Sequence, residues 1–66
     1  MKFIVNGEEM EIGAFLSIEA FLEKRKIISA TVIVEYNYEI PDRDKWQEII
    51  LKEGDNLEIV KFIGGG

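Results

Sequence analysis

A chain of 66 residues forms a single small domain with one thin core, because a domain of this size removes only about 60% of its extended-chain surface from water. Hydrophobic residues make up 47% of the chain and proline occurs once, a composition too apolar for a disordered polypeptide. The chain lacks cysteine and histidine and carries a net charge of −5, which argues against a self-contained catalyst, a zinc–thiolate site and nucleic-acid binding.

The sequence also lacks the marks of a membrane or exported protein. No apolar run approaches the ~20 residues that a membrane-spanning helix needs, and the opening stretch, residues 1–6, is too short for a signal peptide. The absence of cysteine fits a reducing compartment. We therefore expect a soluble protein of the cytoplasm that binds no membrane, no metal and no resident cofactor.

The first predicted element is a β-hairpin. Residues 2–6 alternate, with Phe3 and Val5 on one face of a strand. Asn6 and Gly7 follow, and both tolerate the positive φ angles of a type I′ turn. Residues 9–12 then alternate again and are predicted to form the second strand.

One amphipathic helix is expected from about Ile18 to Lys26. Ser17 can cap it by accepting a hydrogen bond from an unpaired backbone amide. Ile18, Phe21 and Leu22 recur at i, i+3 and i+4 and form an apolar stripe. The cations at positions 24–26 lie where the helix dipole is negative, and we prefer this structural explanation to a binding role.

The second half of the chain begins with a strand, residues 31–36, rich in β-branched and aromatic residues. A turn at residues 37–38 leads into a short strand at residues 39–40, which Pro41 stops early. Residues 42–47 are expected to form a single helical turn, capped by Asp42 and buried through Trp46. After a short apolar segment at 49–51 and a turn at 52–55, the last strand covers residues 56–63.

This order of elements predicts an α+β domain in which one helix packs across one face of a mixed sheet of four to five strands. The domain is expected to cover residues 1–63. Residues 64–66 are expected to form a flexible glycine tail.

Strand alternation predicts apolar side chains on both faces of the sheet. The inward positions, expected to pack against the helix, are Phe3, Val5, Val32, Val34, Leu57 and Ile59. The outward apolar positions are Ile4, Ile33, Val60 and Phe62. Scattered exposed apolar residues are normal, but an uncovered patch is often a binding surface, and Phe62 lies two residues before the glycines. We expect these four residues to contact a partner.

The glycine tail ends in a carboxylate on Gly66, with Gly65 and Gly64 before it. Without a Cβ, these residues fit a narrow channel and leave the terminal carbonyl open to attack. A carboxylate is a poor electrophile, so it would have to be activated first, most directly by adenylation with ATP. The tail alone could equally be a frayed terminus.

Five features follow one another along the chain: residues 2–7 (KFIVNG), residues 35–40 (EYNYEI), Trp46, residues 51–55 (LKEGD) and residues 57–66 (LEIVKFIGGG). In this order and spacing the chain resembles the ThiS-type sulfur carriers of thiamine biosynthesis, which are ubiquitin-like β-grasp proteins. The resemblance covers all 66 residues. It implies a β-grasp sheet with the first and last strands parallel and adjacent at its centre.

The resemblance also implies a function. Gly66 would be adenylated by a ThiF-type enzyme that consumes ATP, and then converted to a thiocarboxylate with sulfur from a cysteine-desulfurase route. The thiocarboxylate would give its sulfur to a ThiG-type thiazole synthase. The chain would thus be a protein co-substrate rather than an enzyme, with Gly64 and Gly65 giving access to the terminus.

Three other roles compete with this one. A MoaD-type carrier would supply sulfur for molybdopterin through the same tail, and a ubiquitin-like modifier would join Gly66 to a lysine. A β-grasp interaction module would bind through its apolar face alone, with an inert tail. A catalytic role would require Asp42 and Asp44 to act as a general acid–base pair. These two residues are better explained as a helix cap and a solvated charge.

Overall fold

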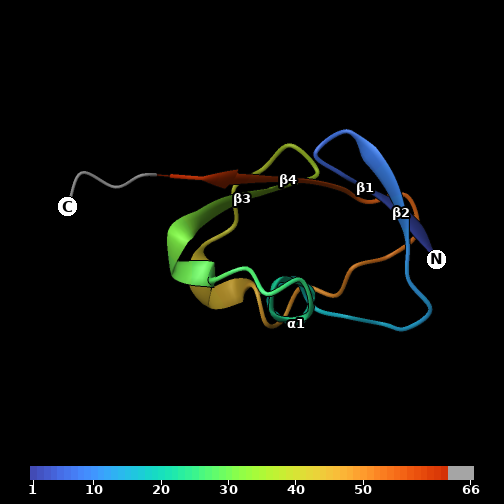
Figure 1. Cartoon of the computed structure of the whole chain (residues 1–66), viewed down its shortest axis with the longest axis horizontal. Coiled ribbons are helices and arrows are strands. Elements are labelled where there is room, and N and C mark those ends of the chain that lie inside the picture. The colour runs from blue at the N-terminus through green and yellow to red at the C-terminus, as the bar shows by residue number, and fades with distance from the viewer. Residues whose placement is uncertain (63–66) are drawn as a thin grey trace.

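A computed structural model describes residues 1–62 of the chain, which form a four-stranded sheet with one α-helix beneath it (Figure 1). Two short 3₁₀ turns connect the main elements. In chain order the elements are β1 Lys2–Val5, β2 Glu8–Glu11, α1 Ile18–Lys24, a 3₁₀ turn Ser29–Thr31, β3 Val32–Tyr36, a 3₁₀ turn Arg43–Lys45 and β4 Asn56–Lys61. The predicted α+β class and the mixed sheet are confirmed.

The sheet places the last strand at its centre. Its strand order is β2-β1-β4-β3, with β1 parallel to β4 and the other neighbours antiparallel. Ile4 pairs with Asn56 and Val5 with Leu57 in the parallel ladder. This is the β-grasp arrangement that the family resemblance implied, because the first and last strands lie side by side.

A fifth strand at residues 39–40 does not form. Glu39 makes only an isolated bridge with Tyr36, across a turn in which Asn37 and Tyr38 have φ angles of 49° and 70°. Pro41 follows at once and cannot donate a hydrogen bond to extend a ladder. The expected hairpin at Asn6 is confirmed, with φ 52°.

The helix ends at Lys24, two residues earlier than predicted. Lys26 adopts the left-handed region with φ 60°, and the amides of Lys26 and Ile27 donate to the carbonyls of Glu23 at 3.0 Å and Leu22 at 2.8 Å. These two bonds form a Schellman motif, which usually has glycine at the left-handed position. Ser17 caps the other end as predicted, accepting from the Ala20 amide at 3.0 Å. In residues 1–62 no helix has the length and apolarity to cross a membrane.

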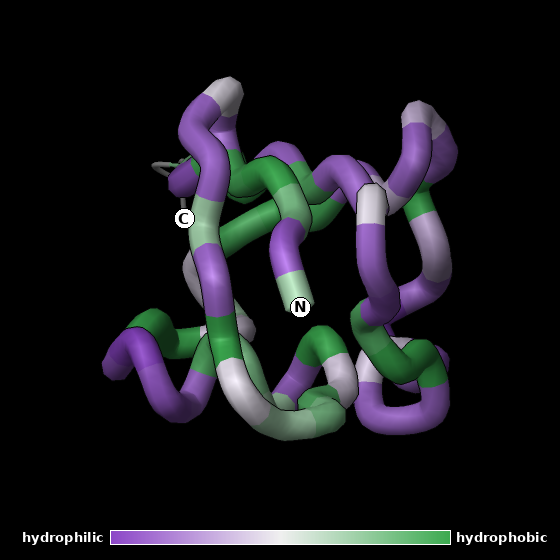
Figure 2. Tube along the Cα trace, turned by 90° about the vertical axis from the view of Figure 1, so that its right-hand side faces the viewer, coloured by the Kyte–Doolittle hydropathy of each residue, from purple (hydrophilic) through white to green (hydrophobic). Residues whose placement is uncertain are grey.

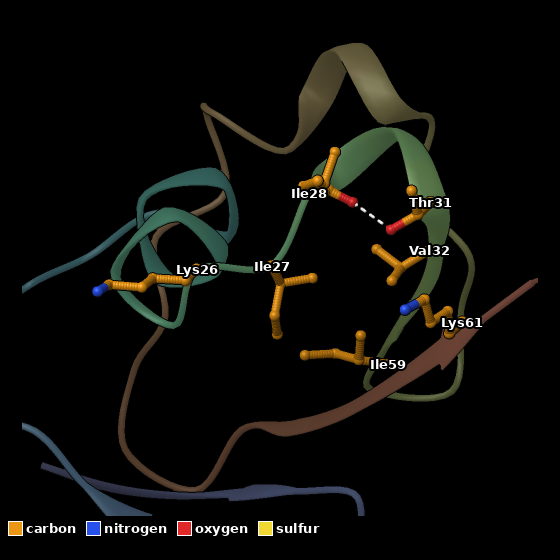
Figure 3. Close-up of a pocket in the computed structure, with 7 residues that line it drawn as sticks. All are labelled: Lys26, Ile27, Ile28, Thr31, Val32, Ile59 and Lys61. Atoms are coloured by element: carbon orange, nitrogen blue, oxygen red, sulfur yellow. Dashed lines mark hydrogen bonds between the residues drawn. The ribbon is translucent and has the colours of Figure 1, made fainter.

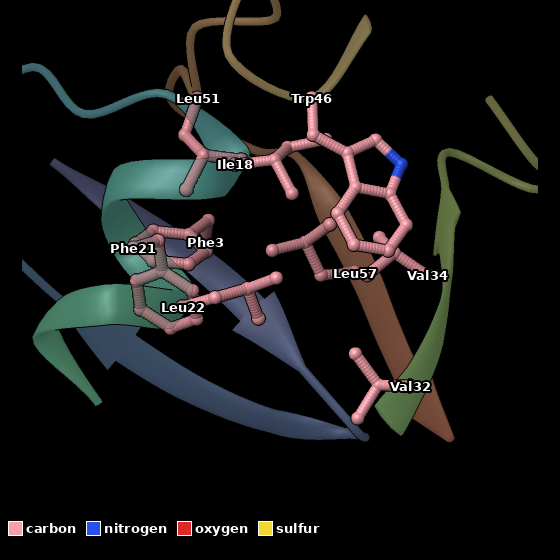
Figure 4. Close-up of a cluster of buried hydrophobic side chains, with 9 residues drawn as sticks. All are labelled: Phe3, Ile18, Phe21, Leu22, Val32, Val34, Trp46, Leu51 and Leu57. Carbon is pink, nitrogen blue, oxygen red and sulfur yellow. The ribbon is translucent and has the colours of Figure 1, made fainter. Parts of the chain in front are cut away.

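The core fills the space between sheet and helix (Figure 4). Seen along the long axis, the strands lie above the helix and alternate between hydrophobic and hydrophilic residues (Figure 2). The rings of Phe3 and Phe21 meet edge to face at 5.4 Å. The buried core residues are Phe3, Ile18, Phe21, Leu22, Val32, Val34, Trp46, Leu51 and Leu57, with Val5 and Ile59 partly buried against them. Every residue predicted to face inward therefore contributes to the core.

The 3₁₀ turn at Arg43–Lys45 brings Trp46 into this core, as predicted, but its cap differs. Asp42 occupies the N-cap position without a side-chain hydrogen bond, so the predicted cap is wrong. Arg43 holds the turn instead: its guanidinium donates to the carbonyls of Ser29 and Val32 and lies 4.7 Å from the centre of the Trp46 ring. A guanidinium on an aromatic face adds a cation–π attraction that Asp42 cannot supply.

Asp55 is the one buried charged residue among residues 1–62, with 3% of its surface exposed. Its carboxylate accepts hydrogen bonds from the Lys52 amide at 2.8 Å, the Tyr36 hydroxyl at 2.9 Å and the Asn37 side-chain amide at 3.2 Å. The Lys52 ammonium lies 3.2 Å from it. The Asp55 carbonyl accepts from the Ile4 amide at 2.9 Å, so the same residue also joins β1.

Burial alone would raise the pKa of the Asp55 carboxyl. The hydrogen bonds from Lys52, Asn37 and Tyr36 outweigh burial and hold the pKa below its ordinary value of 3.8. The charged form is therefore the one that the folded chain stabilises.

Asp55→Asn should lower the free energy of unfolding at neutral pH by about 2 kcal/mol. The substitution removes the negative charge and replaces one acceptor oxygen by an NH2 group, which faces the hydrogen-bond donors around residue 55. The wild-type advantage should be complete above the ordinary pKa of 3.8 and disappear as the pH falls through the lower folded-state pKa. Denaturant titrations of both proteins over this pH range measure the difference.

Asp42→Asn provides the matched control, because Asp42 is exposed and makes no cap hydrogen bond. It should change stability by less than about 0.5 kcal/mol. A loss from Asp42→Asn as large as that from Asp55→Asn would contradict the role given to Asp55.

Candidate functional site

The predicted modification site, Gly66 with Gly64 and Gly65, lies outside the described residues, as does Ile63. The structure describes the strand that leads to it. β4 pairs with β1 at Asn56 and Leu57 and with β3 from Leu57 to Lys61, and just past its end the Phe62 amide donates to the Thr31 carbonyl at 3.1 Å. The path toward Gly66 therefore starts from a strand that enters between β1 and β3 and ends paired with β3.

Three of the four outward apolar residues come together on the sheet face away from the helix. Ile33 and Val60 pair directly across β3 and β4, and Phe62 continues the same side of the chain. Their exposed fractions are 42%, 57% and 40%. We call these three residues the outer-face patch. It lies beside the end of β4.

Ile4 is exposed on the same face but lies apart from the outer-face patch. In the parallel ladder it pairs with Asn56, four residues before Val60 on β4. Four residues of a strand span about 13 Å, and Glu58 occupies the outward position between them. Sequence alternation predicted the direction of Ile4 but could not give its neighbours.

A pair of glutamates on this face was missed by the sequence analysis. The β3–β4 register sets Glu35 directly opposite Glu58, at the next outward position from Ile33 and Val60. Alternation alone already directs both carboxylates outward. Only the pairing of the two strands, which is not local in sequence, reveals that they face each other.

The inner side of the sheet has a hollow of about 330 Å³ where the short helix leaves the end of β4 uncovered (Figure 3). Four aliphatic side chains line it, and the Lys61 ammonium lies beside it. The lining residues are Lys26, Ile27, Ile28, Thr31, Val32, Ile59 and Lys61. The Thr31 hydroxyl already donates to the Ile28 carbonyl at 2.6 Å, and the lining has no carboxylate. The hollow therefore has no acid–base pair.

The three aspartates offer no catalytic pair either. Asp42 and Asp44 are exposed on either side of Arg43, and Asp55 is fully engaged in hydrogen bonds. Within residues 1–62 no group of three or more potential ligands could hold a metal ion. What this part of the chain presents to other molecules is a surface beside a strand end.

Comparison with known proteins identifies the family to which this surface and strand belong. A sequence model described as the ThiS family matches residues 3–66, which is nearly the whole chain. The chain belongs to the ThiS family. The sulfur carrier protein ThiS of Bacillus subtilis is 38% identical over 50 residues, which cover 76% of each chain.

A solved ThiS structure has the same fold. The crystal structure of the thiamine biosynthesis protein ThiS from Geobacter metallireducens superposes with a TM-score of 0.87 at 33% identity, over the full length of both chains. A protein of Paramagnetospirillum magneticum named thiazole synthase is 42% identical over 66 residues. The present chain spans only 20% of that protein's length.

Proposed function

We propose that this chain is a sulfur carrier of thiamine biosynthesis. In this role the Gly66 carboxylate is adenylated by a ThiF-type enzyme, converted to a thiocarboxylate, and used by a ThiG-type thiazole synthase as the source of thiazole sulfur. The chain is then a co-substrate acted on by its partners. The activating partner binds and consumes the ATP, and the carrier itself binds none. This role fits a protein of the cytoplasm.

One observation carries this role: the ThiS family match runs through residue 66 and so includes the three glycines. A match confined to the folded body would support the fold alone. The relatives named sulfur carrier protein ThiS point to the same chemistry. The thiazole synthase relative adds support for a synthase as partner, because a segment similar to this chain forms part of that polypeptide.

The position of β4 suits a substrate terminus. β1 pairs with the first two residues of the strand and β3 pairs with Leu57–Lys61, so a partner that binds the folded body also fixes the direction in which the chain continues. Three extended residues reach about 10 Å, enough to cross the wall of a partner's active site. Glycine at each of these positions adds no side chain to obstruct that passage.

The proposed chemistry takes place in two balanced steps. A carboxylate oxygen of Gly66 attacks the α-phosphorus of ATP, pyrophosphate leaves, and an acyl-adenylate forms. A donor that delivers sulfur at the oxidation level of sulfide then attacks the acyl carbon, and AMP leaves with the bridging oxygen. The terminus has exchanged one oxygen for one sulfur. The partner enzymes must provide every catalytic group, because the described residues of the carrier present none that point to this chemistry.

Incubation with a ThiF-type enzyme, ATP and a sulfide donor should increase the intact mass by the difference between sulfur and oxygen. The reason is that only one atom of the terminus is exchanged. Intact-mass spectrometry measures the change, and omission of ATP is the control. An unchanged mass, under conditions that convert the Bacillus subtilis carrier, would contradict the proposed function.

Deletion of Gly66 should abolish this conversion without changing the free energy of unfolding, because the terminal carboxylate then lies on Gly65, about 3.5 Å short of its place in the partner's active site, and no residue of the sheet is lost. Mass spectrometry and a denaturant titration measure the two effects. A truncated chain that still gained sulfur would contradict the requirement for a carboxylate at residue 66.

Phe62→Ala should raise the KM of the activating enzyme for the carrier by about fivefold or more, the effect expected for a buried aromatic anchor at an interface. ATP–pyrophosphate exchange at varied carrier concentration measures it. Phe15→Ala is the matched control, because Phe15 is 82% exposed and lies far from Phe62 along the chain, beside a separate hollow lined by Met1 and Ile12. Equal effects from both substitutions would contradict a docking role for the outer-face patch.

A further inference from the structure

The two central strands of the sheet differ in length, and the longer one leads to the glycines. β1 ends at Val5, where the chain turns through Asn6 and Gly7 with φ angles of 52° and 83°. β1 therefore pairs with only the first two residues of β4, whereas β4 runs on to Lys61 (Figure 1). Within residues 1–62, the rest of β4 has a ladder with β3 on one side and no strand on the other.

Asn6 extends the contact with β4 beyond the end of the parallel ladder through two hydrogen bonds. Its backbone amide donates to the Leu57 carbonyl at 2.9 Å, and its side-chain oxygen Oδ1 accepts from the Ile59 amide at 2.7 Å. In a regular parallel ladder both bonds would come from the backbone of the same residue, one from its amide and one from its carbonyl. The side-chain oxygen therefore takes the place of a backbone acceptor at the point where the chain turns away.

The Ile59 amide is the last group of β4 that this side of the sheet binds. In the described part of the chain, no hydrogen bond from β1 or from the turn after it reaches β4 beyond Ile59. On the opposite side, the Phe62 amide donates to the Thr31 carbonyl. Without the side chain of Asn6, the second half of β4 would be bound by β3 and Thr31 alone.

The turn at Asn6 does not by itself require asparagine. Glycine and aspartate also occupy the first position of such turns, because both tolerate a positive φ. Glycine would keep the turn but offer no acceptor to the Ile59 amide, whereas aspartate would keep both. The bond to Ile59, and not the turn, therefore accounts for a side-chain acceptor at this position.

We propose that Asn6 is a positioning residue for the tail, because it fixes the strand from which residues 63–66 continue. This inference rests on the proposed function, since it concerns how the folded body directs the Gly66 carboxylate toward ATP in the activating enzyme. Misplacement of a reacting group by about 1 Å can slow an enzyme reaction by about a hundredfold. Asn6 lies outside the outer-face patch, so its loss should lower the rate of adenylation and leave binding of the carrier unchanged.

Two variants of Asn6 separate the side-chain bond from the turn. Asn6→Gly keeps the positive φ and removes the acceptor, while Asn6→Asp keeps both. Asn37→Gly is the matched control, because Asn37 also has a positive φ, 49°, and its side-chain oxygen accepts from the Asn56 amide at 2.8 Å, at the start of β4. Asn37 also donates to Asp55, so this control should lose at least as much stability as Asn6→Gly. Denaturant titrations measure the stability of each full-length carrier.

Native-state hydrogen exchange, followed by NMR, measures how firmly the strand is bound. In Asn6→Gly the protection of the Ile59 amide should fall about fivefold or more relative to that of Leu22 in α1, the effect of losing one hydrogen bond. Asn6→Asp should restore this ratio, and Asn37→Gly should leave it unchanged. An unchanged ratio in Asn6→Gly would overturn the inference.

ATP–pyrophosphate exchange by a ThiF-type enzyme, at varied concentrations of each carrier, measures the effect on the reaction. Asn6→Gly should lower kcat about tenfold while KM changes by less than about twofold, and Asn6→Asp should recover kcat. Asn37→Gly should leave both constants unchanged although it is less stable. An equal loss of kcat in Asn37→Gly, or a rise in KM in place of the fall in kcat, would show a merely structural role and overturn the inference.

The proposed function and the positioning role fail through different results. The absence of exchange with the wild-type carrier would contradict the proposed function, and the positioning role would fall with it. Exchange with the same kcat for wild type and Asn6→Gly would support the function and overturn the positioning role alone.

Discussion

The buried carboxylate of Asp55 is the interaction on which the rest of the sheet depends. It lies between the turn after β3 and the start of β4, and its own carbonyl accepts the Ile4 amide of β1. Around it, the Asn56 amide donates to the Asn37 side chain at 2.8 Å, while the Asn37 amide donates to the Asn56 carbonyl at 2.8 Å. One charged group thus sets where β4 enters between two strands that are distant in sequence. A buried carboxylate is tolerated here because it accepts hydrogen bonds from three donors, on Lys52, Tyr36 and Asn37.

Entry at the centre of the sheet gives β4 two different roles along its length. Its first half, around Leu57, closes the core against Trp46 and the helix. Its second half passes the end of the short helix, so that Val60 is exposed on one face and Ile59 borders the hollow on the other. The strand therefore changes from a core element into a surface element as it approaches the glycines. β4 thus contributes to the core through Leu57 and to the outer-face patch through Val60.

Local chemistry made much of this predictable from the sequence. Asn6-Gly7 gave the first turn, Ser17 gave the helix cap, and alternation gave the correct face for every strand residue of the core. The helix end was missed because Lys26 occupies a left-handed position where glycine is the usual signal. The burial of Asp55 was missed because the segment around it has the composition of an exposed turn. The chemistry of the tail followed from its glycines, but the grouping of the outer face required the register of strands that are far apart in sequence.

The parallel pairing of β1 with β4 also has a consequence for the order in which the protein is made. The first strand leaves the ribosome early, but its central partner, residues 56–61, is synthesised more than fifty residues later. Leu57 of β4 is part of the buried core, so the core is incomplete in any shorter nascent chain. A polypeptide released before β4 lacks the middle of its sheet and stays open to proteolysis. Only a chain that has been synthesised through β4, the strand that leads to the glycines, can therefore complete its sheet.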